Sequence, residues 1–154
     1  TRPQTGPFPQ PSLAHPQQME PDGPHPSYLA ILFRGELPIG GWPSAFVIIS
    51  AYATTGETWS TERNKQADEH MRAELLRHGH APVRITAFDP VTLHAEPSWA
   101  VAMPVEEALA LGRDFLQDAI FLVQDDRLSI AQCASRRTWE VGAFGERLMD
   151  RAPG

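Results

Sequence analysis

Ala45-Phe-Val-Ile-Ile-Ser-Ala-Tyr52 is the stretch of sequence that decides the fold. From Phe46 to Ile49 every residue is apolar, so both side-chain parities are apolar, and the run is too short for a helix. This pattern predicts a central strand that is covered on both faces. The run 119–123 has the same character and predicts a second central strand.

The composition narrows the class of protein. The chain has 154 residues, which predicts one folded domain, and its 13 Lys and Arg against 19 Asp and Glu give a net charge of -6. We therefore expect no nucleic-acid partner, because such an acidic chain does not attract phosphate backbones. No apolar run approaches the roughly 20 residues of a membrane helix, so no membrane association is expected. Cys133 is the only cysteine, which favours a cytoplasmic protein.

The sequence divides into three segments. Residues 1–27 hold eight of the fifteen prolines and few apolar residues, which predicts an extended arm. This arm is either a solvated tail or a segment that lies along a partner protein through Phe8 and Leu13. Residues 28–135 read as an α+β domain. Residues 136–154 are expected to form a C-terminal tail. The apolar residues within 138–149 predict a short amphipathic helix there, which packs either on its own domain or on a partner.

The domain reads as strands and helices in a simple order. A helix is expected over 62–78, with Ser60 or Thr61 as N-cap and Gly79 just beyond its end, and a second helix begins at Pro104. The strands are expected at the residues 28–33, 46–49, 83–88, 98–103, 119–123 and, as an edge strand, 128–131. The middle six elements spell β-α-β-β-α-β. We therefore predict a ferredoxin-like (split βαβ) two-layer sandwich with an extra strand at each end.

This topology brings polar residues to one rim of the sheet. The central strand ends where the first helix begins, the next strand returns there, and the second helix ends there. The side chains predicted to meet at this rim, and therefore to form a ligand-binding site, are Tyr52, Asn64, His94, Glu96, Ser98 and Gln117.

Each rim residue also has a structural interpretation. Glu96 is the candidate catalytic residue, as a general base or a cation ligand, or else its carboxylate holds the backbone of the rim. For Asn64 and Gln117 a structural clamp is the favoured interpretation, because buried amides commonly satisfy backbone groups. His78 and His80 are predicted at the opposite end from His94, so we expect no metal site, and no cofactor is indicated.

Four blocks of sequence occur in the order seen in a known family. They are Ala45 to Tyr52, Asn64 in the first turn of the helix, Glu96-Pro-Ser98, and Glu107 to Ile120. With these blocks the chain resembles an uncharacterised bacterial domain-of-unknown-function family of the DUF3293 type, over about residues 28–133. In that family the strand motif usually continues as aromatic-Asn-Pro, whereas here Ala53-Thr54-Thr55 follows Tyr52. The resemblance implies no activity.

The leading functional hypothesis is a non-enzymatic binding or accessory module. It would engage a partner protein or a small ligand through the polar rim and the terminal arms. The alternative is a small hydrolase-like enzyme with Glu96 as general base and with Asn64, Ser98 and Gln117 orienting the substrate. A second alternative is a structural subunit of a larger assembly.

Overall fold

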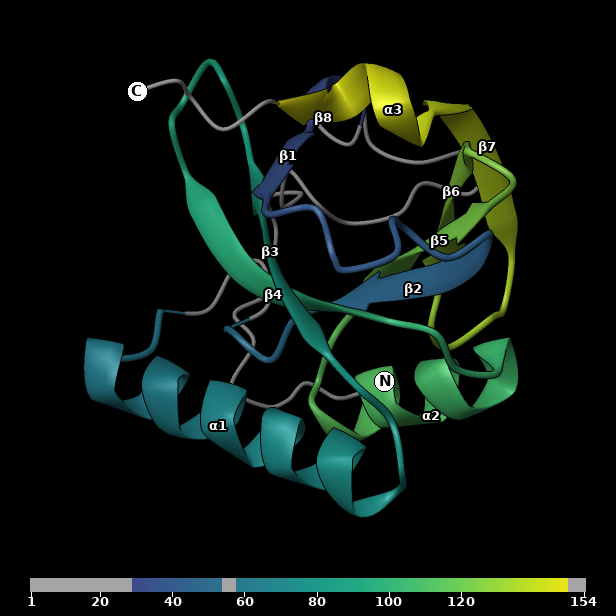
Figure 1. Ribbon diagram of the computed structural model, residues 1–154. Helices are drawn as coiled ribbons and strands as arrows, with labels where there is room; N and C mark the ends of the chain where they lie inside the picture. Colours follow the sequence, from purple (N-terminus) through teal and green to yellow (C-terminus); the bar gives the residue numbers. More distant parts are fainter. Residues whose placement is uncertain (1–28, 54–57, 150–154) are drawn as a thin grey trace.

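The computed structural model describes residues 29–53 and 58–149, and over these residues it shows a mixed α+β fold with one curled eight-stranded sheet (Figure 1). The predicted arm, residues 1–27, lies outside the described residues. In chain order the elements are β1 (Leu32–Gly35), β2 (Ala45–Ile49), α1 (Thr61–Arg77), β3 (Val83–Phe88), β4 (Ala95–Val101), α2 (Val105–Asp114), β5 (Ala119–Gln124), β6 (Arg127–Gln132), β7 (Thr138–Ala143), α3 (Phe144–Arg147) and β8 (Leu148–Met149).

The two strands predicted to be central lie at the centre of the sheet. The strand order is β7-β6-β5-β2-β4-β3-β1-β8, and β2 pairs antiparallel with both β4 and β5. Residues 46–49 of β2 are all buried. This placement follows from the sequence, because a strand that is apolar on both faces must be covered on both.

Helices α1 and α2 cover one face of the sheet (Figure 1). Between them and the sheet lies a core that includes Val47, Ile49, Met71 and Leu75. Helix α1 begins where it was predicted, because the Ser60 hydroxyl accepts a hydrogen bond from the backbone N–H of Arg63 over 3.0 Å. It ends at Arg77, two residues before Gly79 with φ +87°.

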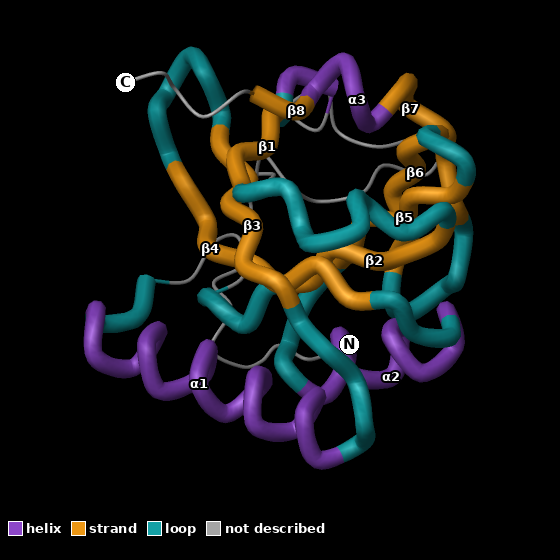
Figure 2. The backbone as a smooth tube through the Cα atoms, viewed as in Figure 1, coloured by secondary structure: helices purple, strands orange, loops and turns teal. Residues whose placement is uncertain are grey.

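The sheet curls around a second core on its opposite face (Figure 2). Aromatic rings dominate this core: Phe33 makes an edge contact with Phe121, and Trp42 stacks on Phe46. Phe144 of α3 covers the open side of this core, since its ring packs against those of Phe33, Trp42 and Phe46. Both faces of β2 are thus covered by a core and shielded from solvent, as its apolar run predicts.

The prediction of a helical tail over 138–149 is wrong. Residues 138–143 form β7, which pairs antiparallel with β6, and only four residues form α3 before β8 pairs with β1. The burial of β7 alternates between half-buried and exposed, with Trp139 and Val141 on one side, which is the period of a strand. The Asp126 carboxylate accepts the backbone N–H of Gly145 over 2.8 Å, which turns the chain after β7.

Three strand predictions also need correction. β6 is not an edge strand, because β7 pairs along its outer side. β1 begins four residues later than predicted, and β4 begins three residues earlier and ends two residues earlier. In both cases the pairing with β3 sets the bounds, with Leu32 opposite Phe88 and Ala95 also opposite Phe88.

Among the described residues, no helix has the length and apolar character needed to cross a membrane.

Candidate functional site

The backbone that leaves β2 is held by side chains from three parts of the chain. The Ser50 hydroxyl accepts the N–H of Tyr52 over 3.0 Å, and the Gln117 side-chain amide donates to the carbonyl oxygen of Tyr52 over 2.8 Å. The Asn64 side-chain oxygen accepts the N–H of Ala53 over 2.9 Å. These contacts fasten residues 50–53 to the start of α1 and to Gln117, three residues after the end of α2.

Local structure places the two amides at this point. Asn64 lies in the first turn of α1, and Gln117 follows the end of α2. That end is a Schellman turn, in which the N–H of Gln117 binds the carbonyl of Gly112 over 2.8 Å and the N–H of Leu116 binds that of Arg113 over 3.1 Å. Both amides bind backbone groups, which agrees with the clamp interpretation of the sequence.

Glu96 lies on β4, opposite Ala87 of β3. Side chains alternate along a strand, so Glu96 projects to the same face as Ala100, which belongs to the core opposite the helices. Its carboxylate is partly buried and has no hydrogen-bond or ion-pair partner among residues 29–53 and 58–149. This burial raises the pKa of Glu96 to about 7. Glu96 is therefore an acid that changes charge near neutral pH.

The hydroxyl groups at this end of the sheet hold backbone groups. Ser98 is buried and donates to the carbonyl of Glu96 over 3.1 Å. Ser50 donates to the carbonyl of Pro97 over 3.1 Å, which ties the end of β2 to β4. The rim residues Tyr52, Asn64, Gln117, Glu96 and Ser98 are thus linked through Ser50 and Pro97.

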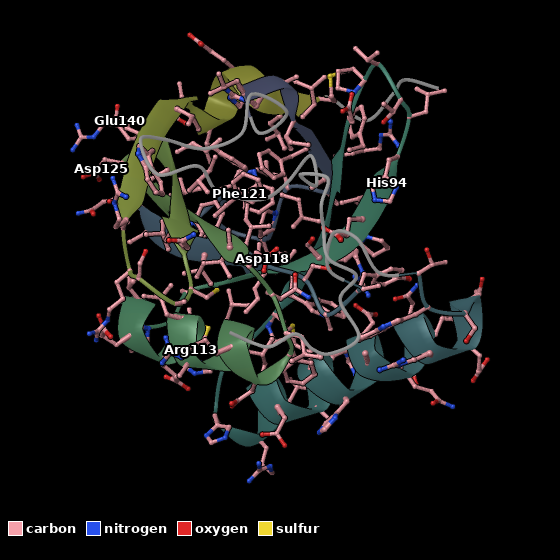
Figure 3. All side chains as sticks on the ribbon, turned by 180° about the vertical axis from the view of Figure 1, so that it is seen from behind. His94, Arg113, Asp118, Phe121, Asp125 and Glu140 are labelled. Atoms are coloured by element: carbon pink, nitrogen blue, oxygen red, sulfur yellow. The ribbon has the colours of Figure 1, made fainter. Side chains whose placement is uncertain are left out.

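The structure does not bring His94 into contact with the other predicted rim residues. His94 is exposed in the connection between β3 and β4, where its backbone N–H binds the Thr92 hydroxyl over 3.2 Å. In Figure 3 it lies on the β4 side of the molecule, well away from Asp118 at the start of β5. Its neighbours along the chain, Val91 and Leu93, are exposed as well.

Of the other histidines in the described part of the chain, His70 lies on α1, and His78 and His80 lie just beyond its end. His80 lies 3.0 Å from Glu107 of α2, and His78 lies 3.5 Å from Glu74. Within the described part of the chain, no group of three or more His, Cys, Asp or Glu side chains is arranged to hold a metal ion. These pairs join α1 to α2 or brace α1 itself.

Sequence reasoning missed an ion pair between α1 and β3 in which the carboxylate is buried and the guanidinium is partly exposed. Asp68 is only 7% exposed, and both its oxygens bind the Arg84 guanidinium, at 3.1 and 2.5 Å. Arg84 also lies over the Trp99 ring, 3.7 Å from its centroid. A signal was present, since Asp68 is four residues from Asn64 and three from Met71 and so shares their helix face.

The segment that builds the clamp can be compared with known families. It runs from the last residue of β2 through both helices to β5. Residues 49–120 match the DUF3293 family.

The DUF3293 match confirms the resemblance, over a shorter range than the sequence blocks suggested. The family is described as a protein of unknown function. The matched range includes Asn64, Glu96 and Gln117, while β6, β7, α3 and β8 lie beyond it. No curated protein and no solved structure matched the chain.

Proposed function

We propose that this protein is a non-enzymatic binding module whose ligand engages the carboxyl group of Glu96. The single observation behind this proposal is that Glu96 is partly buried with no partner for its carboxylate among the described residues. A carboxylate in such a place is costly unless something pairs with it. A ligand with an amine or another hydrogen-bond donor supplies that partner.

The neighbouring groups support binding rather than turnover. Ser98 and Ser50 both donate to backbone carbonyls, and Asn64 and Gln117 both hold residues 52–53. In this arrangement the rim is a rigid frame around one acid, which suits recognition. The arm 1–27 would attach the module to a partner protein in the cytoplasm.

We also infer that β2 to β5 form a ferredoxin-like unit. In support, the strand order β5-β2-β4-β3 has antiparallel neighbours throughout, and α1 and α2 pack on one face. The unit would provide the frame on which Glu96 is presented.

A hydrolase-like enzyme is the second candidate function, and one observation favours it. A pKa of about 7 is the value at which a general base works best near neutral pH. If Glu96 is a general base, the rate of hydrolysis would rise as its carboxyl group ionises. Hydrolysis of p-nitrophenyl acetate measured against pH would then show a midpoint near 7 that Glu96→Gln abolishes.

The binding proposal is tested by titrating the full chain with n-butylamine, putrescine and agmatine while recording amide chemical shifts. We expect saturable shifts centred on β4 in the wild type and none in Glu96→Gln. Glu140→Gln is the matched control, because Glu140 is an exposed strand residue on β7. If all three amines leave the wild type unchanged, or if Glu96→Gln responds like the wild type, the proposal is wrong.

A further inference from the structure

A groove with a cavity volume of about 540 Å³ runs between α1 and α2 on the helical side of the sheet, whereas Glu96 projects to the opposite face. Its apolar lining comes from Ala67 of α1 and from Leu111 and Phe115 at the end of α2. The His70 ring meets the Phe115 ring edge-on at 5.3 Å between centroids, which joins the two walls. A second hollow of about 200 Å³ shares three lining residues with this groove and continues it along the helices.

The two ends of the groove carry opposite charge. At the start of α1 the Arg63 guanidinium lies over the Trp59 ring, 3.8 Å from its centroid. Toward the other end the lining includes Glu74 and Asp114, and the second hollow adds Glu107. Glu74 pairs with Arg77, whereas the Asp114 carboxylate has no partner among the described residues. A ligand that lies along this groove is therefore favoured when it carries negative charge near Arg63 and positive charge near Asp114.

Leu116 stands at the mouth of the groove in a strained conformation. It occupies the position after the helix cap where glycine is usual, with φ +61°, and it is 56% exposed. This conformation presents an apolar side chain beside Phe115 in the lining of the groove.

We propose that this groove binds a short segment of a partner protein that carries basic residues, then apolar side chains, then a carboxylate. The basic side chains pair with Asp114 and Glu74, the apolar side chains contact Phe115 and Leu116, and the carboxylate meets Arg63. The groove is open along its length, with the His70 side chain 67% exposed, which suits an extended segment better than an enclosed small molecule. This inference is independent of Glu96.

The test uses the full chain and the fluorescein-labelled peptide Arg-Lys-Ala-Leu-Phe with a free C-terminal carboxylate. Fluorescence anisotropy should show saturable binding at low salt that weakens as salt rises. Two comparison peptides, Glu-Glu-Ala-Leu-Phe and Arg-Lys-Ala-Ser-Ser, should bind at least about tenfold more weakly. If the first peptide does not bind, or if the three peptides bind equally, the proposal fails.

Two variants separate binding from stability. Leu116→Gly should raise the melting temperature, because glycine accepts the left-handed conformation, and should weaken peptide binding at least about fivefold. Leu93→Gly is the matched control, since Leu93 also has positive φ (+66°) and is 76% exposed, but lies in the β3–β4 connection. It should raise the melting temperature and leave binding unchanged.

The charge partner is tested with Asp114→Lys, which should weaken binding at least about tenfold, against Glu140→Lys on β7 as control. Equal affinity of Asp114→Lys and the wild type would overturn the assignment of the acidic end. Analytical ultracentrifugation of the wild type and of each variant tests whether a second copy of this chain occupies the groove instead. If Leu116→Gly and Asp114→Lys dissociate a dimer of the wild type, a second copy fills the groove and the proposal is wrong.

Discussion

The side-chain amide of Gln117 donates a hydrogen bond of 2.8 Å to the backbone carbonyl of Tyr52, which lies 65 residues earlier in the chain. The same amide donates to the carbonyl of Phe115 over 3.2 Å, so it satisfies the end of α2 as well. With Asn64 bound to the next residue, Ala53, the end of β2 is fixed to both helices. The clamp thus sets the spacing of α1 and α2 at the end where the groove begins.

Gln117→Ala and Asn64→Ala should each lower the free energy of unfolding by about 1 to 3 kcal/mol, because each leaves a partly buried backbone group without its partner. For a chain of this size the melting temperature should fall about 2–4 °C per kcal/mol. Gln66→Ala is the control, since Gln66 is exposed and its one hydrogen-bond partner among the described residues is Glu62; this variant should change stability by less than about 0.5 kcal/mol. Variants that melt at or above the wild-type temperature would contradict the clamp.

Glu96 should make stability depend on pH with a definite sign. Its pKa is raised from 4.5 to about 7 in the folded state, so the folded protein holds this proton more tightly than the unfolded chain does. The resulting stabilisation is complete below about pH 4.5 and is lost as the pH rises through about 7, by about 3 kcal/mol in total. The Glu96→Gln variant should not lose this stability as the pH rises, because its amide does not ionise.

The measurement is urea unfolding of both proteins at about pH 5 and about pH 8. We expect Glu96→Gln to gain stability relative to the wild type at the higher pH. Parallel pH curves for the two proteins would show that the carboxyl group titrates normally.

Gly112 is expected to tolerate no side chain, because a Cβ there would lie 2.7 Å from the sulfur of Cys133 and 3.3 Å from Ile120. Gly112→Ala should destabilise the protein by about 1 to 3 kcal/mol, despite the better helix propensity of alanine. Cys133→Ala makes room, so in a double-mutant cycle the two changes should be less harmful together than their sum. Strictly additive effects would mean that the two positions do not touch.

Asp68→Ala should destabilise the protein by about 1 to 3 kcal/mol, because it removes the partner that Arg84 binds with two hydrogen bonds. The loss of stability is limited because the Arg84 side chain is 41% exposed and water can solvate its guanidinium when Asp68 is removed. Glu106→Gln is the control, because Glu106 pairs with Arg136 on the surface and should contribute less than about 1 kcal/mol. Urea unfolding of the two variants at equal pH makes the comparison, and an equal loss in both would show that burial of Asp68 adds nothing.

The elements that were predicted correctly have signals close together in the sequence. Ser60 and Gly79 mark the ends of α1 through hydrogen bonds and backbone conformations that involve only a few residues. The central position of β2 and β5 follows from apolar side chains on both faces. The positions of Asn64 and Gln117 at one end of the sheet follow from chain direction once the order of elements is known.

The elements that were predicted wrongly depend on residues far along the chain. Val141, Phe144 and Leu148 are three and four residues apart, which is the spacing of a helix, whereas Trp139 and Val141 are two apart, as in a strand. Pairing with β6 selects the strand for residues 138–143. The Arg147 guanidinium then binds the carbonyls of Val141 and Ile31, at 2.7 and 3.1 Å, and so joins the two ends of the curled sheet. The local sequence around Arg147 does not predict a contact with residues this far away along the chain.

By itself, the sequence determined the two long helices, the two central strands and the position of Asn64 and Gln117 at the end of β2. Only the tertiary structure decided which of these groups are satisfied. Asn64 and Gln117 bind backbone partners, while the partly buried carboxylate of Glu96 has no partner among the described residues. The physical reason is that helix ends and burial patterns arise from neighbours in sequence, whereas desolvation and hydrogen-bond pairing depend on what the folded chain places within a few ångströms.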